Sequence, residues 1–83
     1  MASAKKHDVK IYTTPTCVYC VMAKQFFKEN RVEYKEADVA KDHKAAVEMI
    51  DKSGQIGVPV IEVDGKIIIG FDKPALKQAL GLS

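Results

Sequence analysis

Long apolar runs are missing from this sequence of 83 residues. No stretch approaches the roughly 18 apolar residues that a membrane-spanning helix needs. The start of the chain carries a Lys5-Lys6 pair with no apolar segment after it, whereas a secretory signal has an apolar core of about 7–15 residues there. We therefore expect a cytoplasmic protein with no membrane partner.

An excess of charge of one sign is missing as well. The 13 basic and 11 acidic residues leave a net charge of +2, and no basic run is interleaved with aromatic residues. Domains that bind nucleic acid concentrate their basic residues in a patch, so we expect no nucleic-acid partner. Hydrophobic residues make up 47% of the chain, which suffices for one modest core. We expect a flexible tail over residues 1–8, one domain over residues 9–83, and a monomer.

Cysteine and histidine are scarce, with two residues of each. Cys17 and Cys20 lie three positions apart, whereas His7 and His43 form no second pair. Zinc takes four ligands in a structural site, so the spacing disfavours half a zinc site; two unrelated structural thiols are a further alternative. In a reducing cytoplasm a close cysteine pair is more often catalytic or metal-binding than a structural disulfide.

The spacing of apolar residues predicts alternating strands and helices. Strands are expected over residues 9–13, 32–36, 59–63 and 66–69, and helices over about 17–29, 42–52 and 72–80. The last two strands flank Asp64-Gly65, which is typical of a type I′ hairpin. The order β-α-β-α-β-β-α indicates an α/β fold, with a parallel first strand pair and a four-stranded mixed sheet flanked by helices.

The same spacing predicts which helix faces are buried. The inward positions are expected to be Tyr19, Met22, Ala23, Phe26 and Phe27, then Ala46, Val47, Met49 and Ile50, and finally Leu76, Ala79 and Leu80. Asn30 is expected to end the first helix in a left-handed conformation, and Gly54 and Gly81 the others. Asp72 is a suitable N-cap for the last helix.

The Cys17-Val18-Tyr19-Cys20 motif sits where the first strand ends and the first helix begins. Helix positions i and i+3 share a face, so the two sulfurs are close enough for a disulfide. Cys20 continues into the apolar stripe and Cys17 precedes the first full turn, so Cys17 should be the more exposed thiol. Unpaired N–H groups and the helix dipole favour a thiolate at Cys17, with hydrogen bonds contributing most. We predict that Cys17 attacks a disulfide and Cys20 resolves the mixed disulfide.

Together with this motif, Val58-Pro59 opens a later strand and Gly70-Phe71-Asp72 precedes the last helix. On these features the chain resembles the glutaredoxins of the thioredoxin-fold superfamily, in particular short glutaredoxin-like proteins and NrdH-type redoxins, over residues 9–80. The resemblance implies a thioredoxin/glutaredoxin fold. It also implies an oxidoreductase that reduces protein or glutathione mixed disulfides and has no tightly bound cofactor.

The resemblance further implies a substrate groove. Pro59 is expected to be cis, against a general rate of about 5–6% for X–Pro bonds, which would leave the Val58 backbone free to pair with an extended peptide. A trans proline that merely opens an edge strand is the alternative. Gly70 and Phe71 would border the groove.

Three further residues match positions that contact substrate in the family. Asp72 would hold the ammonium of the γ-glutamyl group of glutathione in addition to capping its helix. Gln55 lies in the region that contacts the glycyl end, and an ordinary polar loop residue is an equal alternative. Tyr19 matches the tyrosine of CPYC motifs, although packing alone could explain it.

Four positions depart from the usual glutaredoxin pattern. Thr14 stands where lysine is common, Val18 where CPYC motifs have proline, Gly57 where threonine is usual, and Phe71 where a second glycine is usual. Glutathione is the expected reductant, and the alternative is an NrdH-like redoxin reduced by thioredoxin reductase with NADPH. A glutathione-dependent carrier of a 2Fe–2S cluster across a dimer is a further alternative, because two cysteines cannot hold a cluster alone.

Overall fold

A computed structural model describes residues 7–82 of the chain; most of the predicted tail, residues 1–6, lies outside the described residues. The elements are β1 (Val9–Thr13), α1 (Val18–Glu29), β2 (Lys35–Asp38), α2 (His43–Ser53), β3 (Val60–Val63), β4 (Lys66–Ile69) and α3 (Lys73–Leu80). This is the predicted order, and the predicted fold class is confirmed. Within the described part of the chain, no helix has the length and apolar character needed to cross a membrane.

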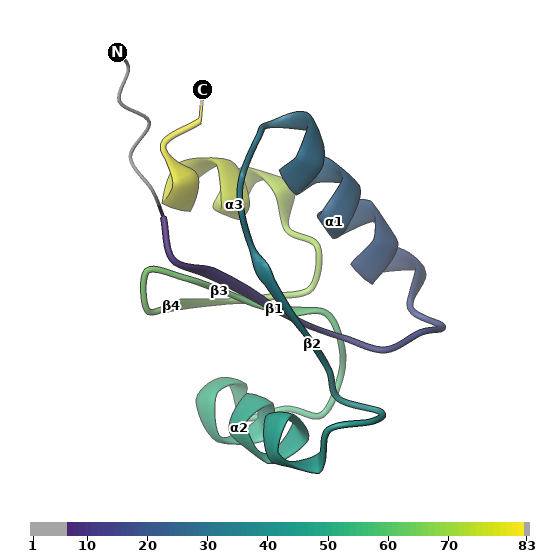
Figure 1. Cartoon of the computed structure of the whole chain (residues 1–83). Coiled ribbons are helices and arrows are strands. Elements are labelled where there is room, and N and C mark those ends of the chain that lie inside the picture. Colours follow the sequence, from purple (N-terminus) through teal and green to yellow (C-terminus); the bar gives the residue numbers. More distant parts are fainter. Residues whose placement is uncertain (1–6, 83) are drawn as a thin grey trace.

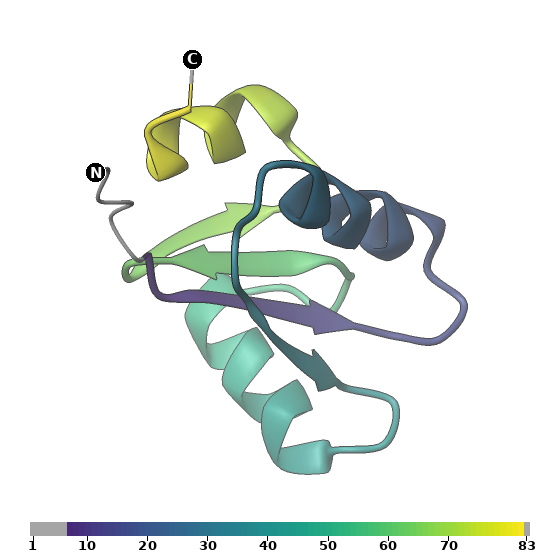
Figure 2. The same cartoon turned by 45° about the horizontal axis from the view of Figure 1, so that its top comes forward.

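The four strands form one mixed sheet in the order β2-β1-β3-β4. β1 pairs with β2 in parallel, whereas β1 with β3 and β3 with β4 are antiparallel. α1 and α3 lie over one face of this sheet and α2 over the other (Figures 1 and 2). Each face therefore has its own apolar cluster: Ile11, Phe27 and Leu76 are central to the first, and Tyr12 and Met49 to the second.

The second strand begins later than predicted. Residues 32–34 are not part of a strand, and pairing with β1 starts at Lys35, opposite Lys10. Val32 N–H donates to the Phe27 carbonyl at 2.8 Å and so closes the end of α1, while the Tyr34 ring packs against Phe27 with centroids 5.3 Å apart. The alternation of apolar residues here thus reflects packing beneath the helix, not a strand.

The end of α1 also differs from the prediction. Asn30 has φ −100, and the residue with left-handed backbone is Arg31, with φ 56. Asn30 donates its side-chain amide to the Phe26 carbonyl at 2.8 Å. This bond satisfies one of the free carbonyls of the last turn, and the reversal of the chain moves to the following residue.

The predicted buried faces are partly wrong. Tyr19 and Met22 are 61% and 43% exposed, and Val47 and Ile50 are 45% and 40% exposed. On α1, both the third and the fourth residue before Ala23 could face the sheet, and Cys20 takes that place in preference to Tyr19. On α2, only Ala45 and Met49 are buried. Among the described residues, α2 is the single helix on this face of the sheet (Figures 1 and 2), and a narrow stripe of its side chains covers the apolar residues of the strands.

The turn signals in the sequence are confirmed. Asp64 and Gly65 have φ 50 and 88, the positive values that a type I′ hairpin requires at both central positions. The Asp64 carboxylate also accepts hydrogen bonds from His7 Nδ1 at 2.6 Å and the Asp8 N–H at 2.8 Å. Asp72 caps α3 as predicted, and Gly81 ends it with φ 71.

Candidate active site

The strand pairing brings three separate segments to one edge of the sheet. Tyr12 pairs with Val60, and Val60 pairs with Ile69. Consequently the segment after β1, the segment before β3 and the segment after β4 all leave the sheet at the same edge, as the loops in Figure 1 show. These segments carry the cysteine motif, Val58-Pro59 and Gly70-Phe71, respectively.

Cys17 is the N-cap of α1, one residue before the helix itself. Its extended backbone, with φ −89 and ψ 111, places Sγ over the first turn, where Sγ accepts the Cys20 N–H at 3.0 Å. Cap residues satisfy N–H groups that have no partner within the helix. A negatively charged sulfur gains more from such a bond than a neutral one, because hydrogen bonds to ionised acceptors are stronger. The arrangement therefore directs one N–H of the first turn of α1 at the Cys17 sulfur.

Cys20 has a different environment. Its side chain is 1% exposed, whereas Cys17 is half-buried. Burial, followed by the hydrogen bond with Cys17, raises the pKa of the Cys20 thiol from 9.0 to about 12. The two sulfurs thus differ as the sequence predicted: the Cys17 sulfur is the more exposed and accepts one N–H, and the Cys20 thiol is buried and held protonated.

The residues predicted to form a groove lie on the two other segments at this edge of the sheet. The Val58–Pro59 peptide bond is cis, as the resemblance implied. The Gly70 N–H donates to the Pro59 carbonyl at 2.8 Å and so ties the segment before α3 to the proline loop. The Phe71 ring packs edge-on against Phe26, with centroids 6.0 Å apart.

Three other residues were predicted to contact substrate, and the structure shows less about their role than about the proline and glycine segments. They are Tyr19, Asp72 and Gln55. The exposure of Tyr19 leaves its ring free for a ligand and removes the interpretation as a core residue. The Asp72 carboxylate accepts the Ala75 N–H at 3.3 Å as a cap. Gln55 hydrogen-bonds through its backbone to Ser53 Oγ, and its side chain is half-buried.

The structure also contains a polar cluster that was not predicted, and its Lys24 lies one helical turn after Cys20. The Lys24 ammonium lies 2.9 Å from Glu36 Oε2, and the Thr13 hydroxyl donates to the same oxygen at 2.8 Å. Thr13 is 1% exposed. The spacing of four residues between Cys20 and Lys24 was the available signal, since such residues are neighbours on one helix face.

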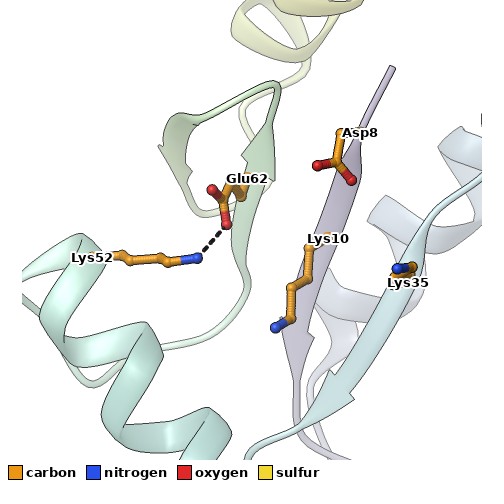
Figure 3. Close-up of a pocket in the computed structure, with 5 residues that line it drawn as sticks. All are labelled: Asp8, Lys10, Lys35, Lys52 and Glu62. Carbon is orange, nitrogen blue, oxygen red and sulfur yellow. Dashed lines mark hydrogen bonds and ion pairs between the residues drawn. The ribbon is translucent and has the colours of Figure 1, made fainter. Parts of the chain in front are cut away.

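A cavity of about 260 Å³ lies elsewhere, near the start of β1 on the α2 side of the sheet. Five charged residues line it, namely Asp8, Lys10, Lys35, Lys52 and Glu62 (Figure 3). Lys52 pairs with Glu62 at 2.8 Å, and Lys10 with Glu48 at 2.6 Å. Because these charges largely neutralise one another and the cysteines follow the opposite end of β1, the cavity is separate from the candidate active site. Among the described residues, no group of three or more His, Cys, Asp or Glu side chains could hold a metal ion.

Comparison with known proteins assigns the class and then the family. The structure of the thioredoxin-like protein BC3987 superposes with a TM-score of 0.82 at 35% identity, covering 87% of this chain and 99% of that one. With the cysteine pair at the start of α1, this likeness defines a thiol redox protein of the thioredoxin fold. The model of the glutaredoxin family matches residues 9–68, and the chain therefore belongs to the glutaredoxin family.

Two curated relatives agree with this assignment. A glutaredoxin-like 8.6 kDa protein in the rubredoxin operon of Clostridium pasteurianum is 42% identical over 72 residues, covering 87% of this chain and 96% of the relative. Glutaredoxin 3 of Escherichia coli (strain K12) is 37% identical over 65 residues, covering 78% of each.

Proposed function

We propose that this chain is a dithiol disulfide oxidoreductase, in which Cys17 attacks and Cys20 resolves. The Cys17 thiolate attacks one sulfur of a substrate disulfide, forms a mixed disulfide and releases the other sulfur as a thiolate. Cys20 then loses its proton and attacks Cys17 Sγ, which releases the second substrate thiolate and leaves a Cys17–Cys20 disulfide. The substrate gains two electrons, and the protein loses two. The observation that carries this proposal is the 3.0 Å bond from the Cys20 N–H to Cys17 Sγ at the cap of α1.

The substrate is proposed to lie across the edge where the three segments meet. The Val58 backbone would pair with an extended stretch of the substrate, while Gly70 and Phe71 form the wall beside it. The Pro59 side chain is fully buried, so its part would be to fix the course of the Val58 backbone. Tyr19, exposed in the first turn of α1, would contact the substrate from the opposite side. Protein disulfides and mixed disulfides with glutathione both fit this description.

Glutathione is the proposed reductant of the oxidised protein. Family membership supports it, and the exposed Asp72 carboxylate at the start of α3 could accept the γ-glutamyl ammonium, with Gln55 near the glycyl end. Reduction by thioredoxin reductase is the second candidate. It is favoured by Ile56, which is 78% exposed two residues before Val58 and offers an apolar contact to a protein partner. We further propose that the protein works as a cytoplasmic monomer without a resident cofactor.

A coupled assay that follows NADPH oxidation tests both parts of the proposal. One arm supplies glutathione with glutathione reductase, and the other supplies thioredoxin reductase, with the same disulfide substrate in each. Cys17→Ser should abolish turnover in either arm, whereas Cys20→Ser should form a mixed disulfide that accumulates. Activity of Cys17→Ser equal to that of the unaltered protein would refute the dithiol cycle. Turnover in the thioredoxin reductase arm alone would refute glutathione as the donor.

A further inference from the structure

Three polar side chains from different elements converge one turn beyond Cys20. Lys24 belongs to α1, Glu36 to β2, and Thr13 is the last residue of β1. Glu36 Oε2 accepts from both Lys24 Nζ at 2.9 Å and Thr13 Oγ1 at 2.8 Å. The ammonium is therefore anchored at a defined place, and the Lys24 side chain is only 28% exposed. Because Lys24 follows Cys20 by four residues, the two side chains are neighbours on the helix.

We propose that Lys24 is a positioning residue for the resolving step, and that its anchored positive charge favours the thiolate of Cys20. The inference rests on the proposed dithiol cycle, since only that cycle requires Cys20 to ionise. Glu36 and Thr13 act through Lys24, because they hold its ammonium against the sheet.

The resolving step needs such a charge because Cys20 is buried. Burial is the largest influence on the pKa of the Cys20 thiol and raises it, and the hydrogen bond with Cys17 raises it further. A hydrogen bond with the Thr14 backbone lowers this pKa, and the charge of Lys24 lowers it as well, to a smaller extent. When Cys17 is part of a mixed disulfide, its own negative charge is gone. The Cys20 proton then passes to water, the Cys20 sulfur forms its bond with Cys17 Sγ, and the substrate sulfur leaves with the electron pair. A cation beside Cys20 stabilises the ionised sulfur at the point of attack.

The other charged or titratable groups near this cluster are few. Tyr34 contributes to the raised pKa of Lys24, and the charge of Lys28 contributes to the lowered pKa of Glu36. Lys28 lies on the exposed side of the last turn of α1 and makes a matched control, since its removal changes the net charge by the same amount. The pKa of Glu36 is lowered, first by the Lys24 bond and then by Thr13, so the anchor stays ionised at neutral pH.

Stopped-flow reaction of the reduced full chain with one equivalent of dithiobis(nitrobenzoate) tests the inference. The first release of coloured thiolate reports attack by Cys17, and the second reports resolution by Cys20. Lys24→Gln should leave the first release unchanged and slow the second about fivefold at pH 7, the size expected of one nearby charge at a partly buried site. The midpoint of the pH profile of the second release should correspondingly shift to higher pH by roughly 0.7 unit. Lys24→Arg should restore the second release, and Lys28→Gln should leave both releases unchanged.

Three results would overturn the inference. An unchanged second release in Lys24→Gln would show that the charge does not act on Cys20. An equal slowing of both releases in Lys24→Gln, together with a lower melting temperature, would indicate a structural role for Lys24. Absence of a second release in the unaltered protein would instead refute the dithiol cycle itself, so the two failures are distinguishable.

Discussion

Alkylation of the reduced protein should distinguish sharply between the two cysteines. The thiolate is the form that reacts with iodoacetamide, and burial followed by the bond with Cys17 raises the pKa of Cys20 from 9.0 to about 12. At neutral pH this rise lowers the thiolate fraction of Cys20 about a thousandfold relative to a cysteine with the ordinary value. The side chain is also 1% exposed, which hinders approach of the reagent. We therefore expect Cys17 to be labelled while Cys20 stays free.

Mass spectrometry of peptides after timed labelling measures both rates in one sample. The same reaction in denaturant is the control, because unfolding removes both burial and the cap and should make the two rates similar. Cys17→Ala removes the lesser cause, the hydrogen bond, and keeps the burial, so Cys20 should remain slow in that variant. Equal labelling of Cys17 and Cys20 in the folded protein would refute the assignment of attacking and resolving thiols.

Three further predictions concern stability and are measured by denaturant unfolding. Leu76→Ala should lower the free energy of unfolding by about 2–5 kcal/mol, because Leu76 is 0% exposed in the core beneath α3; a change near zero would contradict this packing. Asp72→Ala should cost about 1 kcal/mol through loss of the α3 cap, whereas Asp72→Asn should cost less. The Lys10 ammonium, and then the Tyr12 hydroxyl, hold the pKa of Glu48 at about 2, below its ordinary 4.5. A lowered carboxyl pKa stabilises the folded state above the unfolded value and ceases to do so as the pH falls through the folded value. The stability difference between the unaltered protein and Glu48→Gln should therefore be present above pH 4.5 and disappear toward pH 2; a difference independent of pH would refute this.

The predicted buried face of α1 was wrong where two neighbouring residues could both face the sheet. Tyr19 and Cys20 both lie one turn before Ala23, and the apolar spacing placed both of them on the buried face. In the structure Cys20 is buried and Tyr19 is exposed. That outcome leaves the Cys20 thiol protected and an aromatic ring exposed in the first turn of α1. Similarly, Val32 and Tyr34 have the alternation of a strand, but their contacts with the end of α1 displace the pairing to Lys35.

Features that depend on residues close together in the chain could be predicted from the sequence. The cysteine motif at a strand-to-helix junction, the Asp64-Gly65 hairpin and the Asp72 cap each involve groups a few positions apart, so their chemistry is local. The packing of helices and strands against one another sets which helix face is buried. It also sets which residues, distant in sequence, meet at one site. Thr13, Lys24 and Glu36 meet at one oxygen atom only because β1, α1 and β2 pack together. Such meetings depend on long-range packing, about which spacing along the chain carries little information.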